Sequence, residues 1–225
     1  QTAYPDRIRW FASLPFEYPD KAIAELHRAL ENGAVGVMVT ASINGKHLID
    51  PLFEPVWAEI NKLALPVLVR PTAPFGAKEA EFGIERILMP GAGFMFDTTI
   101  GIARMAVDGF FERFKDLKII ASHGGGYIPY VSGRIDMFFQ VETLTKLKID
   151  KLPSEYFSQI YYDAVLYDPG ALALCIDIAG PEKVLFGTDF PMPCDVPKLY
   201  DMIDTRPPDE VKAIKSGNAM KLFNL

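Results

Sequence analysis

The amino-acid sequence predicts an α/β protein built on a parallel sheet. Six apolar, strand-like segments alternate with helical patterns along the 225 residues, and no hairpin signal interrupts them. Such alternation implies right-handed crossovers and leaves two architectures, a doubly wound sheet and a (β/α)8 barrel. Neither a glycine-rich dinucleotide fingerprint after the first strand nor a phosphate-binding G-x-x-x-x-G-K occurs. Polar residues instead follow several strands, as in barrel enzymes, so the barrel is favoured, although six strands are two fewer than a barrel contains.

Composition and length indicate an ordinary globular chain. Hydrophobic residues make up 49% and charged residues 23% of the sequence, and one domain over residues 1–225 is expected. The net charge of -6 argues against nucleic acid and anionic membranes as partners. No apolar run approaches the roughly 20 residues that span a bilayer. Two cysteines, Cys175 and Cys194, do not form a disulfide framework, so a reducing cytoplasm is expected.

Boundary signals divide the first part of the chain into three strands and two helices. Pro15 ends the first strand, Asp20 provides an N-cap for the following helix, and Asn32-Gly33 ends that helix. Pro71 breaks the third strand. The expected strands lie at residues 8–14, 35–40 and 66–71, and a loop at residues 43–51 leads into a second helix around residues 52–63.

The second part of the chain opens with an irregular stretch at residues 75–96, whose length is typical of a lid or a binding loop. Asp97 or Thr98 is expected to cap the next helix, whose apolar stripe continues to Phe114. A strand at residues 119–121 follows. The remaining expected elements are a helix near residues 128–147, a strand at 160–165, a helix from 168 to 179, a strand at 183–189, and closing helices at 196–203 and 208–223.

His123 is the first candidate for chemistry. The segment L-K-I-I-A-S-H-G-G-G-Y carries one histidine from a buried strand directly into three glycines. The strand is expected to end at the carboxyl edge of the sheet, where ligands bind, and the glycines let backbone N–H groups approach a ligand. The alternative is a tight strand-to-helix turn whose histidine only packs or caps.

Asp189 and Arg70 are the second and third candidates. Asp189 ends the apolar segment V-L-F-G-T-D, and a carboxylate there needs a metal, a cation or a hydrogen-bond network unless it only caps the next turn. With His123 it suggests general acid–base chemistry or a metal centre. Arg70 lies at a strand end before a proline, where its guanidinium would bind a carboxylate in two-pronged fashion or form an ion pair with an acid such as Asp189.

The other chemically capable residues give weaker signals. Three histidines in all nearly exclude a multi-histidine metal site built from this chain alone, and His27 and His47 have the settings of surface or structural residues. Asp163 either supports the site from the next strand or pairs locally. Cys194, with no base evident beside it, is a weak nucleophile candidate.

Three segments, in this order, resemble a known family: S-H-G-G-G-Y-I-P-Y-V-S-G-R-I, Y-Y-D-A-V-L-Y-D-P and V-L-F-G-T-D-F-P-M-P. The chain is similar to the amidohydrolase-related decarboxylases, the group of aminocarboxymuconate-semialdehyde, γ-resorcylate and 5-carboxyvanillate decarboxylases. Further similar segments, among them E-L-H-R-A-L-E-N-G-A-V-G-V and the terminal S-G-N-A-M-K-L-F, extend the resemblance over essentially the whole chain. The combination is specific for the family but not for a substrate.

The resemblance implies a distorted (β/α)8 barrel that holds one divalent metal, zinc or manganese. It implies that His123 is the acid–base histidine and that Asp189 is a metal ligand. Arg134 matches an arginine that in some members reaches into the neighbouring subunit to bind a substrate carboxylate, which implies a homodimer. The implied reaction is non-oxidative loss of CO2 from a carboxylated aromatic or muconate-like acid, with positive groups holding the substrate anion.

Two departures from the family pattern leave alternatives open. The sequence contains no H-x-H pair, and its resemblance begins near the third strand of the family, so the first two strands are expected upstream of Gln1. Arg70-Pro71 replaces an H-P pair that carries a metal-binding histidine, and a guanidinium cannot ligate a metal. One alternative is a hydrolase or hydratase of a carboxylated small molecule in which Arg70 binds the carboxylate. The other is a catalytically impaired relative that binds a small acid.

Overall fold

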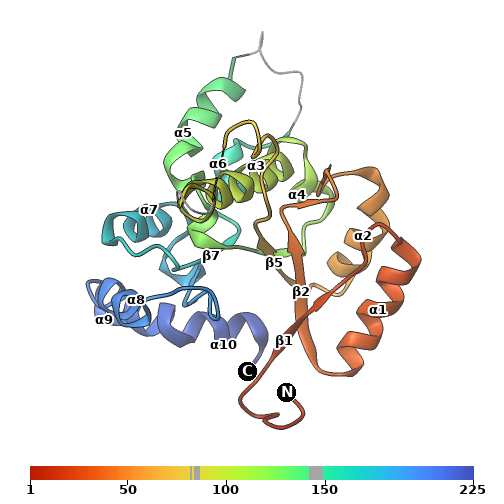
Figure 1. Cartoon of the computed structure of the whole chain (residues 1–225), viewed down its shortest axis with the longest axis horizontal. Coiled ribbons are helices and arrows are strands. Elements are labelled where there is room, and N and C mark those ends of the chain that lie inside the picture. The colour runs from red at the N-terminus through yellow and green to blue at the C-terminus, as the bar shows by residue number, and fades with distance from the viewer. Residues whose placement is uncertain (82, 84–86, 142–148) are drawn as a thin grey trace.

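The computed structural model describes residues 1–81, 83, 87–141 and 149–225 and contains a six-stranded parallel sheet (Figure 1). The strands lie in chain order. With right-handed crossovers, strands in chain order keep their helices on one face, whereas a doubly wound sheet reverses and covers both faces. The winding is therefore that of a barrel; among the described residues the two edge strands, β1 and β8, do not pair with each other. In sheet order the strands are β1 (Trp10–Ser13), β2 (Ala34–Thr40), β5 (Pro66–Arg70), β6 (Lys118–Ala121), β7 (Tyr161–Asp163) and β8 (Val184–Leu185).

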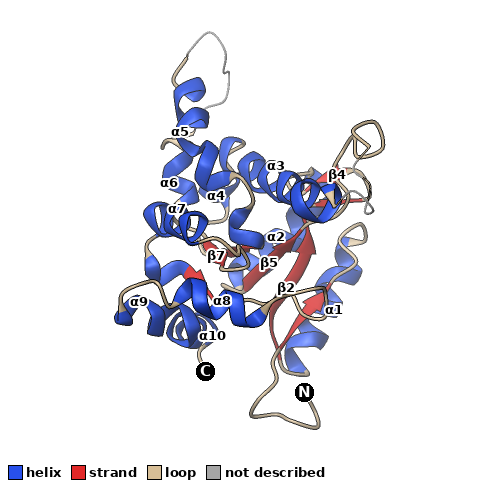
Figure 2. Ribbon diagram, turned by 60° about the vertical axis from the view of Figure 1, so that its left-hand side comes forward, coloured by secondary structure: helices blue, strands red, loops and turns tan. Residues whose placement is uncertain are grey.

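Helices follow the strands and cover the outer face of the sheet, as α1 and α2 do beside β1 and β2 (Figure 2). The main core lies between these two layers. Trp57 of α2 is buried there, and its indole N–H donates to the carbonyl of Leu48 over 2.8 Å. No helix among the described residues is long and apolar enough to cross a membrane. The helices are α1 (Pro19–Glu31), α2 (Glu54–Lys62), α3 (Phe94–Val107), α4 (Phe110–Arg113), α5 (Ile128–Phe139), α6 (Pro153–Phe157), α7 (Pro169–Ala179), α8 (Val196–Ile203), α9 (Pro208–Lys212) and α10 (Asn218–Phe223).

Alternation along the strands decides which side chains reach the inner, concave face. In β5, Val67 and Val69 are fully buried in the main core. Successive residues of a strand point to opposite faces, so Leu68 and Arg70 face the concave side, where both line a cavity. In β6, Ile120 lines the same cavity. The alternation along β5 therefore delivers its charged side chain, Arg70, to the inside of the sheet.

The C-terminal helix α10 packs on the concave face. Leu222 is buried in a small cluster with Ile120 of β6, and the ring of Phe223 meets the ring of Phe11 of β1 edge-on at 5.6 Å. Both ends of the chain consequently lie at the same end of the molecule (Figure 1). This helix forms one wall of the cavity near the amino ends of the strands.

The expectation that the chain contains no hairpin is wrong. Residues 42–47 form a short antiparallel hairpin of β3 (Ser42–Ile43) and β4 (Lys46–His47). Its turn residues, Asn44 and Gly45, both have positive φ, at 46° and 78°. Asn-Gly is the pair that favours this two-residue turn, so the signal lay in the sequence, inside a stretch interpreted as a loop.

Several element boundaries also differ from the expected ones. The helix expected from Asp97 starts earlier, at Phe94, and ends at Val107, because Gly109 adopts φ 71° and separates α4 from α3. Asp97 therefore lies within the helix and is not its N-cap. The last strand stops at Leu185, short of the expected residue 189. Helix α5 ends at Phe139, and residues 142–147 of its expected range lie outside the described residues, as do residues 82 and 84–86 of the expected lid.

Candidate active site

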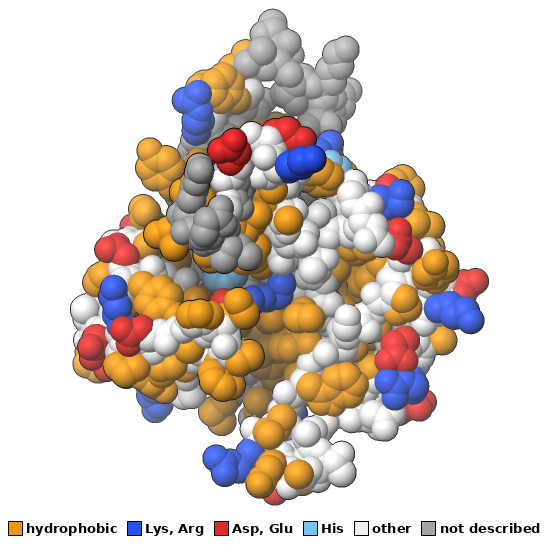
Figure 3. All heavy atoms as spheres, in the orientation of Figure 1, with side chains coloured by type: hydrophobic (Ala, Val, Ile, Leu, Met, Phe, Trp, Pro, Cys, Tyr) orange, Lys and Arg blue, Asp and Glu red, His pale blue; other side chains and the backbone are white. Residues whose placement is uncertain are grey.

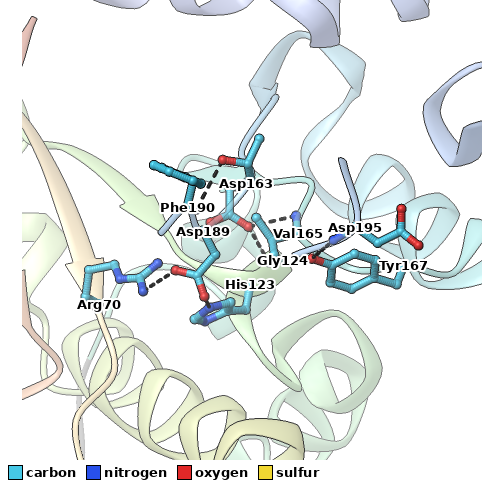
Figure 4. Close-up of polar contacts among 10 residues, drawn as sticks. Arg70, His123, Gly124, Asp163, Val165, Tyr167, Asp189, Phe190 and Asp195 are labelled. Atoms are coloured by element: carbon cyan, nitrogen blue, oxygen red, sulfur yellow. Dashed lines mark hydrogen bonds and ion pairs between the residues drawn. The ribbon is translucent and has the colours of Figure 1, made fainter. Parts of the chain in front are cut away.

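Four polar side chains meet at the carboxyl edge of the sheet (Figure 4). Arg70 ends β5, His123 follows β6, Asp163 ends β7, and Asp189 follows β8. These four strands are consecutive neighbours in the sheet. Because parallel strands bring their carboxyl ends to one edge, residues as far apart in sequence as Arg70 and Asp189 come into contact.

Asp189 is the centre of the group. Its Oδ1 accepts a short hydrogen bond from Nη2 of Arg70, and its Oδ2 lies 3.5 Å from Nε2 of His123. The side chain of His123 is only 8% exposed, whereas those of Arg70 and Asp189 are 27% and 20% exposed. Of the two interpretations of Arg70, the structure shows the ion pair. The carboxylate thus lies between a permanent cation and an imidazole that exchanges protons.

The imidazole of His123 presents Nε2 to this carboxylate. Its other nitrogen, Nδ1, is buried and has no hydrogen-bond partner among the described residues. For a neutral imidazole, we assign the tautomer with its proton on Nε2, because Nε2 can donate to Asp189 whereas Nδ1 has no acceptor in the described part of the chain. Nδ1 then carries a lone pair. The proton at Nε2 faces Asp189, which lines the cavity.

A run of left-handed residues holds His123 in place. His123 has φ 54°, and the three glycines after it have φ of 59°, 73° and 64°. A Cβ atom on Gly125 would lie 2.5 Å from the ring of Tyr162, and one on Gly126 would overlap the carbonyl oxygen of Met95. The three glycines are therefore required by close packing as well as by backbone conformation.

Asp163 fixes this turn from the neighbouring strand. Its Oδ1 accepts hydrogen bonds from the backbone N–H groups of Gly124 and Val165, both at 3.1 Å. Cys175 of α7 contacts the same turn, since its Sγ donates to the carbonyl of Gly124 over 3.4 Å. Burial raises the pKa of Cys175 to about 12, so its thiol stays protonated and serves packing. Of the two interpretations of Asp163, support of the site is the one that the structure shows.

A cavity of about 460 Å³ opens beside the polar group, on the concave face of the sheet. Its walls are mainly apolar, and Arg70, Asp163, Thr188 and Asp189 supply its polar end. His123 is not among the lining residues, but its Nε2 lies 3.5 Å from Oδ2 of Asp189, which is one of them. Figure 3 shows the hollow, with hydrophobic side chains on its walls and charged groups at its rim. The apolar lining is completed by Phe11, Met38, Leu68, Ile120, Val165, Leu185, Phe186, Gly187, Phe190, Pro191, Met192, Ala219 and Phe223.

The remaining candidates lie apart from this group. His27 of α1 is exposed and pairs with Glu59, with Nε2 and Oε1 3.1 Å apart. His47 lies in the hairpin, 3.0 Å from Nη1 of Arg104, and burial together with that guanidinium lowers the pKa of His47. Arg134 of α5 is exposed, with its guanidinium 4.8 Å from the ring centre of Phe138. Cys194 is partly buried in the segment after Asp189.

Helix α3 contributes two residues to the site, Thr99 and Asp97, that local sequence patterns did not mark as site residues. Thr99 Oγ1 accepts from the N–H of Tyr127 over 2.7 Å and so fastens the end of the glycine turn. Asp97 is buried and accepts from the N–H of Thr72 over 2.8 Å, just after β5. Burial raises the pKa of Asp97 above its ordinary value near 3.8. Contacts over 25 and 28 residues leave no local signal in the sequence.

Metal-binding capacity follows from the donor set. Within the part of the chain that the structure describes, His123 and Asp189 are the two side chains that present ligand atoms to each other at the site, and Asp189 is also paired with the guanidinium of Arg70. Over the described ranges, no group of three His, Cys, Asp or Glu side chains is placed to hold a metal ion. A site that binds zinc needs three or four such ligands. The residues present, in this arrangement, do not fit a divalent metal.

Comparison with known proteins places the chain in context. A family model described as amidohydrolase matches residues 2–225. The chain is 30% identical to the 2-amino-3-carboxymuconate-6-semialdehyde decarboxylase of Dictyostelium discoideum over 227 residues, which cover 98% of the chain and 62% of the relative. The chain therefore spans less than two thirds of the length of this relative.

Two solved structures share the fold over the full length of the chain. The 5-carboxyvanillate decarboxylase of Sphingomonas paucimobilis superposes with a TM-score of 0.88 at 28% identity, covering 100% of this chain and 69% of that one. The dihydroxybenzoic acid decarboxylase of Polaromonas sp. JS666, solved with bound manganese and the inhibitor 2-nitroresorcinol, superposes with a TM-score of 0.87 at 26% identity. Coverage there is 100% of this chain and 71% of the other.

Proposed function

The chain belongs to the amidohydrolase family, and from that premise we propose that the protein is a non-oxidative decarboxylase of small carboxylated aromatic or muconate-like acids. One observation carries the proposal. A buried imidazole and a carboxylate, His123 and Asp189, stand with the cation Arg70 at the polar end of a mainly apolar cavity. Such a cavity suits a planar, apolar body with an anionic group at one end. Similarity to decarboxylases of this chemistry supports the same conclusion.

The reaction needs one proton and releases one molecule of CO2. Arg70 binds the substrate carboxylate by charge and hydrogen bonds and holds the ring against the apolar wall. In its acid form, which carries one proton more than a neutral imidazole with a carboxylate, the His123–Asp189 pair delivers that proton to the ring carbon that carries the carboxylate. The bond between that carbon and the carboxylate then breaks, its electron pair returns to the ring, and CO2 leaves. The pair regains its proton from water.

The expected zinc or manganese is not used in this scheme. A related decarboxylase contains manganese, but the donor atoms described above do not fit a divalent metal while Arg70 is paired with Asp189. Each step is therefore assigned to side chains of this chain.

Decarboxylation is tested by following CO2 release from 2,6-dihydroxybenzoate and related carboxylated phenols with the protein at its full natural length. His123→Asn is expected to lower kcat about a thousandfold, because it removes the proton donor and leaves a smaller, polar, non-titrating amide in its place. His27→Asn is the matched control and should leave kcat unchanged, since His27 is exposed and pairs with Glu59 away from the cavity. Absence of CO2 release from every acid would overturn the assignment, and product analysis in the same assay would detect hydrolysis or hydration.

A homodimer with Arg134 at its interface completes the proposal. Helix α5 exposes Tyr130, Met137 and Phe138 beside Arg134, with exposed fractions of 82%, 47% and 41% for the three apolar side chains. An exposed apolar face with an arginine is typical of a protein interface. The residue implied by the resemblance to reach the neighbouring site thus lies on a face suited to a second copy. Sedimentation of the purified protein measures the dimer. The two free cysteines support a proposed location in the reducing cytoplasm.

A further inference from the structure

We infer that Arg70 is the fixed positive charge of this site. Its guanidinium is paired with the carboxylate of Asp189 and also binds the carboxylate of the substrate directly, in the role that a divalent metal would otherwise have. The inference rests on the proposed function for the identity of the ligand, an aromatic carboxylate. It deepens that function because it assigns the substrate anion to one side chain. It also makes ligand binding independent of added metal.

Position is the first argument. Arg70 is the last residue of β5, and alternation along that strand turns its side chain onto the concave face. It lines the cavity together with Asp189, and its side chain keeps 27% of its surface exposed. The guanidinium is therefore reachable from the cavity although its stem is held by the sheet.

Unused hydrogen-bond capacity is the second argument. A guanidinium has five N–H donors in a planar fork, and it keeps its charge at every physiological pH. In the described part of the chain, Asp189 is the one side chain that pairs with Arg70. The remaining donors suit a second carboxylate, and the arginine can hold Asp189 and a substrate anion at the same time.

Charge balance is the third argument. Arg70 and Asp189 neutralise each other, and Asp163, a further carboxylate that lines the cavity, accepts from two backbone N–H groups. Arg70 is therefore the fixed cation that an anionic substrate meets at this end of the cavity. A divalent cation on Asp189 would instead lie within a few ångströms of the guanidinium, whose charge would repel it. It would also have to displace Arg70 from Oδ1. The pair that prepares the site for an anion thus opposes a metal.

The experiment measures binding and not activity. The protein at its full natural length is treated with EDTA, exchanged into metal-free buffer, and titrated with 2,6-dihydroxybenzoate in a calorimeter. The wild type is expected to bind, with the same affinity after Mn²⁺ is added. Loss of binding after chelation that Mn²⁺ restores overturns the inference.

Variants locate the cation. Arg70→Ala is expected to weaken binding of the probe about 30-fold or more, as loss of a desolvated charge partner does. Arg70→Lys keeps the charge but not the planar fork, and its affinity for the probe should lie between those of the wild type and Arg70→Ala. Arg206→Ala is the matched control, because Arg206 pairs with Glu210 at similar exposures, 26% and 23%, away from the cavity. Unchanged binding by Arg70→Ala, with an unfolding transition like that of the wild type, overturns the inference.

Direct titration with Mn²⁺ tests the exclusion of metal. The wild type is expected to bind less than one equivalent at the site, and Arg70→His is expected to bind more, because it removes the guanidinium and adds an imidazole beside Asp189. One equivalent of Mn²⁺ in the wild type that Asp189→Asn removes would overturn the inference. Failure of decarboxylation is a separate result. If binding of the acid depends on Arg70 but no CO2 is released, the inference about Arg70 is supported and the proposed decarboxylase function is overturned.

Discussion

The two sides of the candidate site are built in different ways. On one side, Ser122, His123, Gly124 and Gly125 are all buried, and the backbone runs through four successive residues with positive φ. On the other side, the segment that carries Asp189 is partly or fully exposed, with Phe190 at 80% and Met192 at 53%. His123 is therefore held in place by packing, whereas Asp189 is held by its contacts with Arg70 and His123.

This difference has a chemical meaning. A proton donor must be held within fractions of an ångström of its target, and a tightly packed turn provides that precision. A ligand also needs a way in, and elements at a cavity mouth are drawn from the less stable part of a structure. In the proposed reaction, the packed side keeps the acid–base group in place and the open side admits the substrate. Substitutions on the two sides should consequently differ in size and in kind.

Gly126→Ala should give the largest effect. Its Cβ would lie 2.6 Å from Thr99 Oγ1 and would overlap the carbonyl oxygen of Met95, at φ 64°. Left-handed strain and overpacking together are expected to lower the free energy of unfolding by about 3 kcal/mol. Urea unfolding followed by circular dichroism measures the loss.

Two other glycines provide the comparison for that substitution. Gly187→Ala, on the open side, meets Val165 Cγ2 at 3.1 Å without positive φ and should cost about 1 kcal/mol. Gly133→Ala lies within α5 with no heavy atom inside 4 Å and should raise stability by up to about 1 kcal/mol. Equal losses at Gly126 and Gly187 would contradict the distinction between a packed and an open side.

Much of the fold followed from local patterns. Apolar runs ended by single polar residues predicted the six strands, and the alternation with helices predicted that they are parallel, which the sheet confirms. Local patterns missed two features, the break between α3 and α4 and the hairpin of β3 and β4, because other patterns at the same residues favoured a different structure. Gly109 interrupts an apolar stripe that continues through Phe114, and Asn44-Gly45 lay within a stretch whose strands have only two residues each. Short or interrupted elements give too little periodicity to be recognised.

Of the predicted site residues, Arg70, His123 and Asp189 meet at the edge of the sheet. Arg134 lies apart on α5, and the contacts among the other three were not predictable. His123 and Asp189 stood out because each ends an apolar run, where a polar side chain needs a reason. For Arg70, an ion pair with Asp189 and a role in binding an anion were equally compatible with the sequence, because the sequence does not show which charges meet across the sheet. Asp163 was likewise open between two roles. Its two backbone contacts depend on the register of β6 and β7, which only the fold determines.

Asp163→Ala should give the next largest effect, because it attacks the packed side without adding atoms. It leaves the N–H groups of Gly124 and Val165 without an acceptor in a buried place. Buried unpaired donors are costly, and the free energy of unfolding is expected to fall by about 2 kcal/mol. Hydrogen exchange at the amide of Gly124, measured by NMR, should become faster.

Asp163→Asn is the conservative partner of this substitution. Its side-chain oxygen can still accept both hydrogen bonds, although a neutral acceptor is weaker than a carboxylate. It should restore most of the stability and the slow exchange at Gly124. If Asp163→Asn behaved like Asp163→Ala, the charge of Asp163, and not its hydrogen bonds, would be what holds the turn.

Helix α3 connects the packed side with the loop that follows Arg70, the ion-pair partner of Asp189 on the open side. Its Thr99 fastens the end of the glycine turn, and its Asp97 accepts from the N–H of Thr72, two residues beyond Arg70. A substitution at Asp97 therefore tests whether the open side depends on the helix that supports the packed one.

Asp97→Asn should give the smallest effect, visible mainly as a change in pH dependence. Burial raises the pKa of Asp97 above 3.8, so between 3.8 and the higher value the folded state binds more protons than the unfolded state. Stability from this group then falls as pH rises through that window and stays lower at neutral pH.

The amide of Asn keeps an acceptor for Thr72 and carries no charge to desolvate. The variant should therefore be at least as stable as the wild type at pH 7 and should show a flatter decline above pH 3.8. Urea unfolding at several pH values measures both. A variant less stable than the wild type at pH 7 with an unchanged slope would show that the charged carboxylate supports the loop after Arg70, and the two sides would then be coupled through α3.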